Sequence, residues 1–178
     1  MRFEKILKGG DLRSIGKTRE VVAMVNDQQS FDELYQLLFH PDRKIVMRAA
    51  DAIEKITVNH PEYLYAHKNQ ILPLLTSAGN IELKWHLAQL IPRLSLTRPE
   101  ANKAVRVLFS WASDPKESRI VRANALQSLD EIISNFIDHK KEFLELIATI
   151  KKENIPSLNA RIKILEAKRE ASKGDSKD

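Results

Sequence analysis

Three twelve-residue segments of the chain share one pattern of apolar and polar positions, and each begins 38 residues after the previous one. They are IVMRAADAIEKI (45–56), LKWHLAQLIPRL (83–94) and VRANALQSLDEI (121–132). With positions numbered from 0 to 11, apolar or small residues occupy positions 0, 4, 7, 8 and 11. At about 100° per residue these positions fall within about 100° of one another, which predicts a helix with one buried stripe. A fixed period of this length indicates a stacked repeat fold, and such folds provide extended binding surfaces.

Proline and capping residues divide the chain into short predicted helices. Thr97 and Glu100 have the spacing of a capping box, as do Ser30 and Glu33, and each box marks a helix start. Pro92 lies inside a repeated segment, where it should kink the helix or end it early. The helices predicted from these signals form about four pairs, each pair about 38 residues long, with the repeated segment in the second helix. A weaker fourth copy of the pattern begins at Leu158.

The pattern predicts three regions. Residues 1–29 do not fit the period and are expected to form N-terminal capping helices, because a terminal repeat has one face in water. Residues 30–170 carry the repeats, and the polar residues 171–178 are expected to be a disordered tail. The chain has 178 residues and no cysteine, and its five glycines are few enough to favour an all-α fold. With no apolar run suited to a signal peptide or a membrane span, we expect a cytoplasmic or nuclear protein that is not secreted and has no membrane partner.

The repeats resemble HEAT repeats, a family of stacked helix pairs. The third copy carries the resemblance best, with Asp114-Pro115 in the turn and then Val121-Arg122, Ala125 and Leu129. The resemblance implies a right-handed α-α superhelix whose second helices line a concave groove. Family arginines at position 1 often pair with turn aspartates of neighbouring repeats. Only Arg122 and Asp114 match that pattern here, so a continuous ladder of such pairs is not expected.

By this resemblance, positions 3, 6 and 10 of the repeated segments form the floor of the groove, and position 2 adds its rim. Arg48, Lys55, His86 and Arg93 would make one end basic, and Glu131 would make the other acidic. Trp85 has two readings, packing between helices or contact with a partner, since tryptophan is enriched in interface hot spots. Trp111 is expected in the core. The candidate groove residues are Met47, Arg48, Asp51, Lys55, Trp85, His86, Gln89, Arg93, Asn124, Gln127 and Glu131.

The sequence has no catalytic or cofactor motif that we can assign. None of the five histidines lies four residues from another, and there is no His-Glu dipeptide of the kind used by helical-repeat hydroxylases. Glycine-rich phosphate loops are also absent. We therefore expect no enzyme activity, no metal and no cofactor. The leading function is a non-catalytic interaction module that binds a helix or an extended peptide in its groove. The alternative is a nucleic-acid-binding protein, including a DNA-glycosylase-like one, since the net charge is +5.

Overall fold

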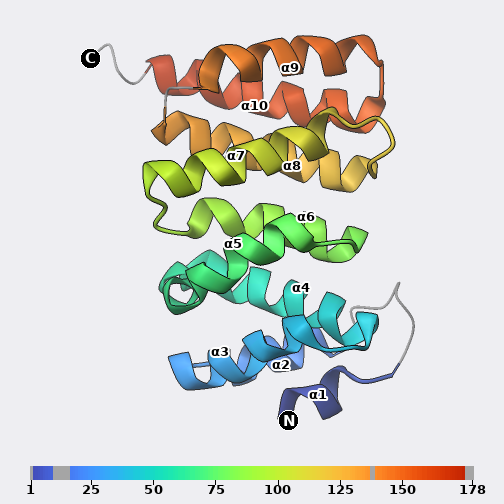
Figure 1. Cartoon of the computed structure of the whole chain (residues 1–178), viewed down its shortest axis with the longest axis vertical. Coiled ribbons are helices and arrows are strands. Elements are labelled where there is room, and N and C mark those ends of the chain that lie inside the picture. Colours follow the sequence, from blue (N-terminus) through green and yellow to red (C-terminus); the bar gives the residue numbers. More distant parts are fainter. Residues whose placement is uncertain (1, 10–16, 137–138, 175–178) are drawn as a thin grey trace. The chain divides into compact units, whose positions relative to one another are not determined.

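The computed structural model describes residues 2–9, 17–136 and 139–174, with side chains described up to residue 171 (Figure 1). Every regular element in the described part of the chain is a helix, and none of these residues lies in a strand. The chain divides into two compact units, Met1–Ser95 and Leu96–Asp178. The predicted all-α fold built from helix pairs is confirmed.

The first unit begins with two short helices that precede the first pair. The pair α3–η1 and α4 follows, and then the pair η2–α5 and α6. Helix α4 packs against α2, α3, η1, η2 and α6. The bounds are α1 (Arg2–Leu7), α2 (Thr18–Met24), α3 (Gln28–Tyr35), η1 (Gln36–Phe39), α4 (Arg43–Asn59), η2 (Pro61–His67), α5 (Lys68–Ser77), α6 (Ile81–Leu90) and η3 (Ile91–Arg93).

Side-chain caps and one proline set the helix ends in this unit. The prediction that Ser30 starts a helix is wrong, because Asp27 caps α3 and accepts a hydrogen bond from the Ser30 backbone N–H at 2.7 Å. Asp42 caps α4 by accepting from the Lys44 N–H at 2.9 Å. Pro92 has no N–H to continue the ladder, so α6 ends as an α-helix at Leu90 and finishes in the 3-10 turn η3, as expected.

The second unit contains two helix pairs, α7 with α8 and α9 with α10. The capping box at α7 is confirmed, because Glu100 Oε2 accepts from the Thr97 N–H at 2.7 Å. Helix α10 runs to Gly174, so residues 171–174 of the predicted tail are helical, while 175–178 lie outside the described residues. The bounds are α7 (Arg98–Ser113), α8 (Arg119–Asn135), α9 (Lys140–Lys152) and α10 (Pro156–Gly174).

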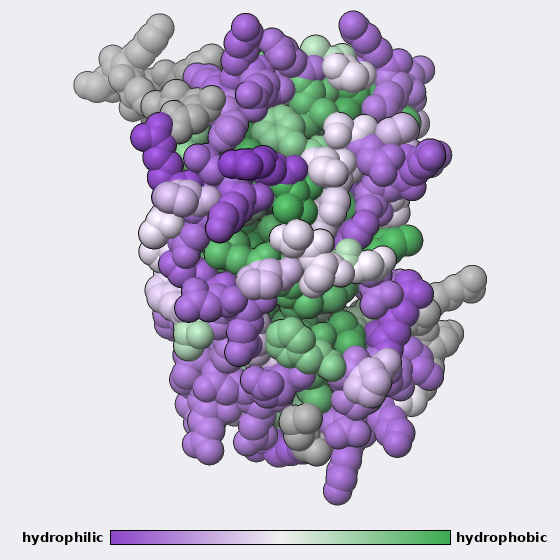
Figure 2. Space-filling model, viewed as in Figure 1, coloured by the Kyte–Doolittle hydropathy of each residue, from purple (hydrophilic) through white to green (hydrophobic). Residues whose placement is uncertain are grey.

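The predicted apolar stripes form the cores of the two units. All residues at positions 0, 4, 7, 8 and 11 of the three segments are buried, and so are the three apolar residues of the fourth copy. Trp111 is buried, which confirms its predicted place in the core. On the face drawn in Figure 2, apolar residues (green) show through between polar residues (purple). The residues of the fourth copy are Leu158, Ile162 and Leu165.

Candidate protein-binding surface

The predicted groove residues divide into buried and partly exposed side chains. Lys55, Trp85, Gln89 and Arg93 reach solvent in the first unit, as do Gln127 and Glu131 in the second. The expectation that position 3 faces solvent is wrong, because all three residues at that position are buried. The buried members of the predicted groove are Met47, Arg48, Asp51, His86 and Asn124.

Helix geometry explains why position 3 is buried. At about 100° per residue, position 3 lies only about 40° from position 7, which belongs to the apolar stripe. A second helix such as α4 also packs against α2 and α3 on one side and against α6 on another. The buried arc is therefore much wider than the stripe, and position 3 falls inside it.

Arg48 illustrates what such a buried polar side chain does. Its guanidinium is 1% exposed, and its Nη1 donates to the carbonyl oxygens of Leu7, at 2.6 Å, and Gly9. Leu7 is the last residue of α1, whose terminal carbonyls have no partner within the helix. Arg48 therefore attaches the N-terminal helix to α4 and presents no charge to a partner.

His86 is equally inaccessible, and it is uncharged. Its ring is 1% exposed and contacts the Trp85 ring at 3.5 Å between centroids. Burial, and secondarily the charge of Lys55, lowers the pKa of His86 to about 3. The imidazole is therefore neutral near pH 7. Its Nδ1 is buried without a hydrogen-bond partner in the described part of the chain.

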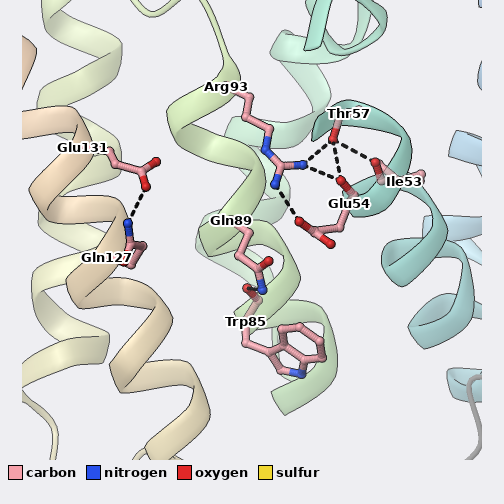
Figure 3. Close-up of polar contacts among 8 residues, drawn as sticks. All are labelled: Ile53, Glu54, Thr57, Trp85, Gln89, Arg93, Gln127 and Glu131. Carbon is pink, nitrogen blue, oxygen red and sulfur yellow. Dashed lines mark hydrogen bonds and ion pairs between the residues drawn. The ribbon is translucent and has the colours of Figure 1, made fainter. Parts of the chain in front are cut away.

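The two partly exposed cations of the predicted groove, Arg93 and Lys55, are paired with acids from the same unit. Arg93 Nη2 contacts Glu54 Oε1 at 2.6 Å, and its Nη1 donates to Thr57 Oγ1 at 2.7 Å (Figure 3). Lys55 Nζ contacts Asp51 Oδ2 at 2.6 Å. The predicted basic end of the groove is therefore wrong for the described residues, since each of its four members is paired, buried or neutral.

Polar contacts within α8, and between α8 and α10, involve the corresponding part of the second unit. Gln127 Nε2 donates to Glu131 Oε1 at 2.5 Å, as Figure 3 shows. Gln127 Oε1 in turn accepts from Arg161 Nη1 at 3.0 Å. A third contact joins Arg169 Nε to Asp130 Oδ1 at 2.5 Å. The two contacts made by Arg161 and Arg169 join α8 to α10, so these side chains serve the stacking of the pairs.

Sequence reasoning missed two of these inter-helix ion pairs, although a signal for them exists. Glu54 and Asp130 both occupy position 9 of their segments, and each pairs with an arginine 39 residues further on. The spacing is close to the repeat period, which brings the arginine of one second helix beside the acid of the preceding one. A search for opposite charges one period apart would have found both pairs, Arg93 with Glu54 and Arg169 with Asp130.

Arg122 also pairs within its own unit, with Glu153 and not with the turn residue Asp114. Its guanidinium is buried and bonds both carboxylate oxygens of Glu153 at 2.7 Å, and its Nε donates to the Ala112 carbonyl at 2.9 Å. These hydrogen bonds hold the pKa of the Glu153 carboxyl below its usual range. Asp114 instead accepts from the Lys116 backbone N–H in its own turn, at 2.9 Å.

On the second helices of the first unit, the side of α6 that carries Trp85 is still accessible to a partner. Trp85 and Gln89 lie four residues apart and project from the same side of the helix (Figure 3). Trp85 is partly exposed, and its indole nitrogen makes no hydrogen bond to another described residue. Its ring therefore packs on His86, while the residue as a whole remains partly exposed. We call Lys55, Trp85 and Gln89 the Trp85 face.

These observations define the chain as a protein of stacked helix pairs. A family model described as HEAT repeat domain matches residues 9–168, so the chain belongs to the HEAT-repeat family. No curated protein and no solved structure matches it. HEAT repeats generally mediate protein–protein interaction or scaffolding, and the family is typically non-catalytic.

The described residues contain no group of three or more His, Cys, Asp or Glu side chains that could hold a metal ion. None of the helices in the described part of the chain is both long enough and apolar enough to span a membrane.

Proposed function

We propose that the chain is a non-catalytic protein-interaction module, and that in its first unit the partner docks on the Trp85 face. The observation that carries the proposal is the partly exposed Trp85 on a second helix, where its ring packs on the neutral His86. Tryptophan supplies a large apolar contact area and a donor N–H, which is why it is enriched among interface hot spots. The HEAT-repeat family supports the general role.

The neighbouring side chains indicate what kind of partner would fit. Lys55 is held by Asp51, so the pair adds little net charge near His86, on whose ring the indole packs. Gln89 Nε2 donates to the Trp85 carbonyl at 3.5 Å, and its amide oxygen can still accept a hydrogen bond from a partner. A partner helix or extended peptide with an apolar anchor would bury the Trp85 ring and place polar groups against Gln89.

Nucleic-acid binding has less support on these helices. A groove for phosphates needs cations that are available to exchange their counterions. Lys55 of α4 and Arg93 of η3 pair with acids of the same unit, and Arg48 of α4 is buried against backbone carbonyls. Gln127 and Glu131, the partly exposed groove residues of α8, add no positive charge. The proposal therefore concerns a protein partner.

Substitution of the tryptophan tests the proposal directly. The full chain and its Trp85→Ala variant are used to capture partners from nuclease-treated native lysate, and the retained proteins are quantified by mass spectrometry. A hot-spot tryptophan is expected to cost at least 2 kcal/mol, or about thirtyfold in affinity. Arg93 is left unchanged, because altering it would break its pair with Glu54.

Tyr65→Ala is the matched control, because Tyr65 is an exposed aromatic residue of the same unit outside the Trp85 face. Circular dichroism melts establish that both variants remain folded. Partners lost from Trp85→Ala and retained by Tyr65→Ala support the proposal. Equal retention by the two variants, or equal loss, would exclude the Trp85 face as the docking surface.

A further inference from the structure

A second candidate site lies on the first helices of the pairs, away from the residues discussed above. In the first unit, a hollow of about 570 Å³ opens to solvent between η1 and α5. This volume falls within the range of roughly 300–1,000 Å³ typical of ligand sites. We call it the Phe39 pocket. The residues that carry the argument are Gln36, Phe39, Asn69, Gln70, Pro73 and Leu74.

A proline gives the pocket an exposed backbone acceptor. Pro73 lies inside α5 and has no N–H, so the carbonyl of Asn69, four residues earlier, lacks its usual helical donor. Both residues line the pocket, which places this carbonyl on the helix face that borders it. A carbonyl without its i+4 helical donor on such a wall can accept a hydrogen bond from a ligand.

Three side-chain amides add further donors and acceptors. Gln36, Asn69 and Gln70 make no side-chain hydrogen bond to another described residue. Each amide can donate through its nitrogen and accept through its oxygen, which matches the N–H and C=O of a peptide group. No residue that lines the pocket carries a charge.

The rest of the wall is apolar and unusually open. The Phe39 side chain is 51% exposed, although aromatic side chains of this size are normally largely buried. Leu74 and Pro73 lie on the opposite wall, contributed by α5. An apolar side chain placed between these walls would remove the Phe39 ring from water, which is favourable in proportion to the area covered.

We propose that the Phe39 pocket binds an extended, uncharged peptide segment of a partner protein that carries an apolar side chain. The extended form follows from the hydrogen-bonding groups, because a helix satisfies its own backbone and would leave the amides and the Asn69 carbonyl unpaired. The uncharged composition follows from the lining, since a charged segment would lose hydration without gaining an ion pair. The inference goes beyond the Trp85 face, and either site can exist without the other.

A random heptapeptide library displayed on phage tests the proposal. The library is selected on the immobilised full chain, with prior depletion on the Leu74→Glu variant, which places a carboxylate in the pocket. We expect enrichment of uncharged heptamers with an apolar residue. Their affinity should fall at least tenfold on both Leu74→Glu and Phe39→Ser, and should stay unchanged on Trp85→Ala, which separates this site from the Trp85 face.

Backbone N-methylation of an enriched peptide then tests the extended conformation. Some N–H groups of the peptide are expected to donate to the Asn69 carbonyl or to the oxygen of a side-chain amide in the pocket. Methylation of one such N–H should weaken binding about tenfold, as expected for one lost hydrogen bond. The proposal is overturned if no heptamer is enriched over the Leu74→Glu background, or if charged sequences dominate. It is also overturned if methylation at every position leaves the affinity unchanged.

Discussion

Buried polar side chains are the features of this protein that matter most at the scale of single residues. Arg48 and Arg122 are each 1% exposed, and each is held by carbonyl or carboxylate oxygens. Such pairing is required, because a buried charge without partners is strongly destabilising. His86 differs from the two arginines because it is uncharged. Its Nδ1 has no hydrogen-bond partner in the described part of the chain, and the neutral ring does not carry the cost of a buried charge.

The neutral state of His86 predicts a pH-dependent loss of stability. The folded pKa of about 3 lies below the value of about 6.5 for unfolded histidine, so protonation favours the unfolded chain. This loss of stability is absent above the unfolded pKa and grows as the pH falls from about 6.5 towards 3. Between pH 7.5 and pH 5.0, histidine at this position should cost about 2 kcal/mol of unfolding free energy.

Urea denaturation of the wild type and of His86→Leu at both pH values measures this cost. Leucine cannot titrate and fills an apolar site, so the variant should lose about 2 kcal/mol less than the wild type between pH 7.5 and 5.0. If the two proteins lose the same free energy over this interval, His86 is not held neutral by burial.

At the scale of helices, two ion pairs attach a second helix to the preceding second helix. Arg93 of η3 reaches Glu54 of α4, and Arg169 of α10 reaches Asp130 of α8. Asp130 is 3% exposed, while its arginine also lies 4.7 Å from the Phe143 ring centroid. Each pair therefore combines a charge contact with the packing of neighbouring repeats.

Removal of Arg169 should be costly because it leaves a buried carboxylate alone. We expect Arg169→Met to lower the unfolding free energy by about 3 kcal/mol, as for other broken buried pairs. Arg43→Met is the control, since the Arg43–Glu82 pair joins α4 to α6 at the surface and should cost less than about 1 kcal/mol. Adding Asp130→Asn to Arg169→Met should recover part of the loss, because the unpaired group is then neutral. Equal losses from the two arginine variants in chemical denaturation would contradict this account.

The burial of individual helix positions shows how far the sequence could predict the structure. The apolar stripe was predicted correctly because burial at positions such as Ile45 or Leu87 depends on the helix itself and its period. The open surface could not be read from a single helix, because neighbouring helices decide whether Arg48 or His86 meets water. The helix start at Asp27 was missed because Ser30 fits a capping box either as its first residue or as its last. The sequence pattern does not distinguish these two roles, and in the structure Ser30 is the last residue of the box.

Net charge is the property of the whole molecule that bears on its partners. The first unit has 13 basic and 11 acidic side chains, and the second has 16 and 13, so the excess of +5 is spread over both. Positive charge attracts nucleic acid without regard to its sequence, and binding releases counterions from the phosphates. The free-energy gain from this release shrinks as the salt concentration rises, so the affinity falls steeply with salt. A thinly spread excess is therefore expected to give weak binding that salt abolishes.

Fluorescence anisotropy with a mixed-sequence 20-base-pair duplex tests that expectation. At about 50 mM salt we expect weak binding, and at about 150 mM no binding tighter than the roughly 1–100 µM range of non-specific complexes. Trp85→Ala should leave the titration unchanged, because the weak attraction arises from net charge rather than from the Trp85 face. Sub-micromolar binding at 150 mM salt that Trp85→Ala weakens would contradict the proposal of a protein partner. It would require cations near the indole to be available for phosphates, and so would replace the protein partner proposed for this face with a nucleic acid.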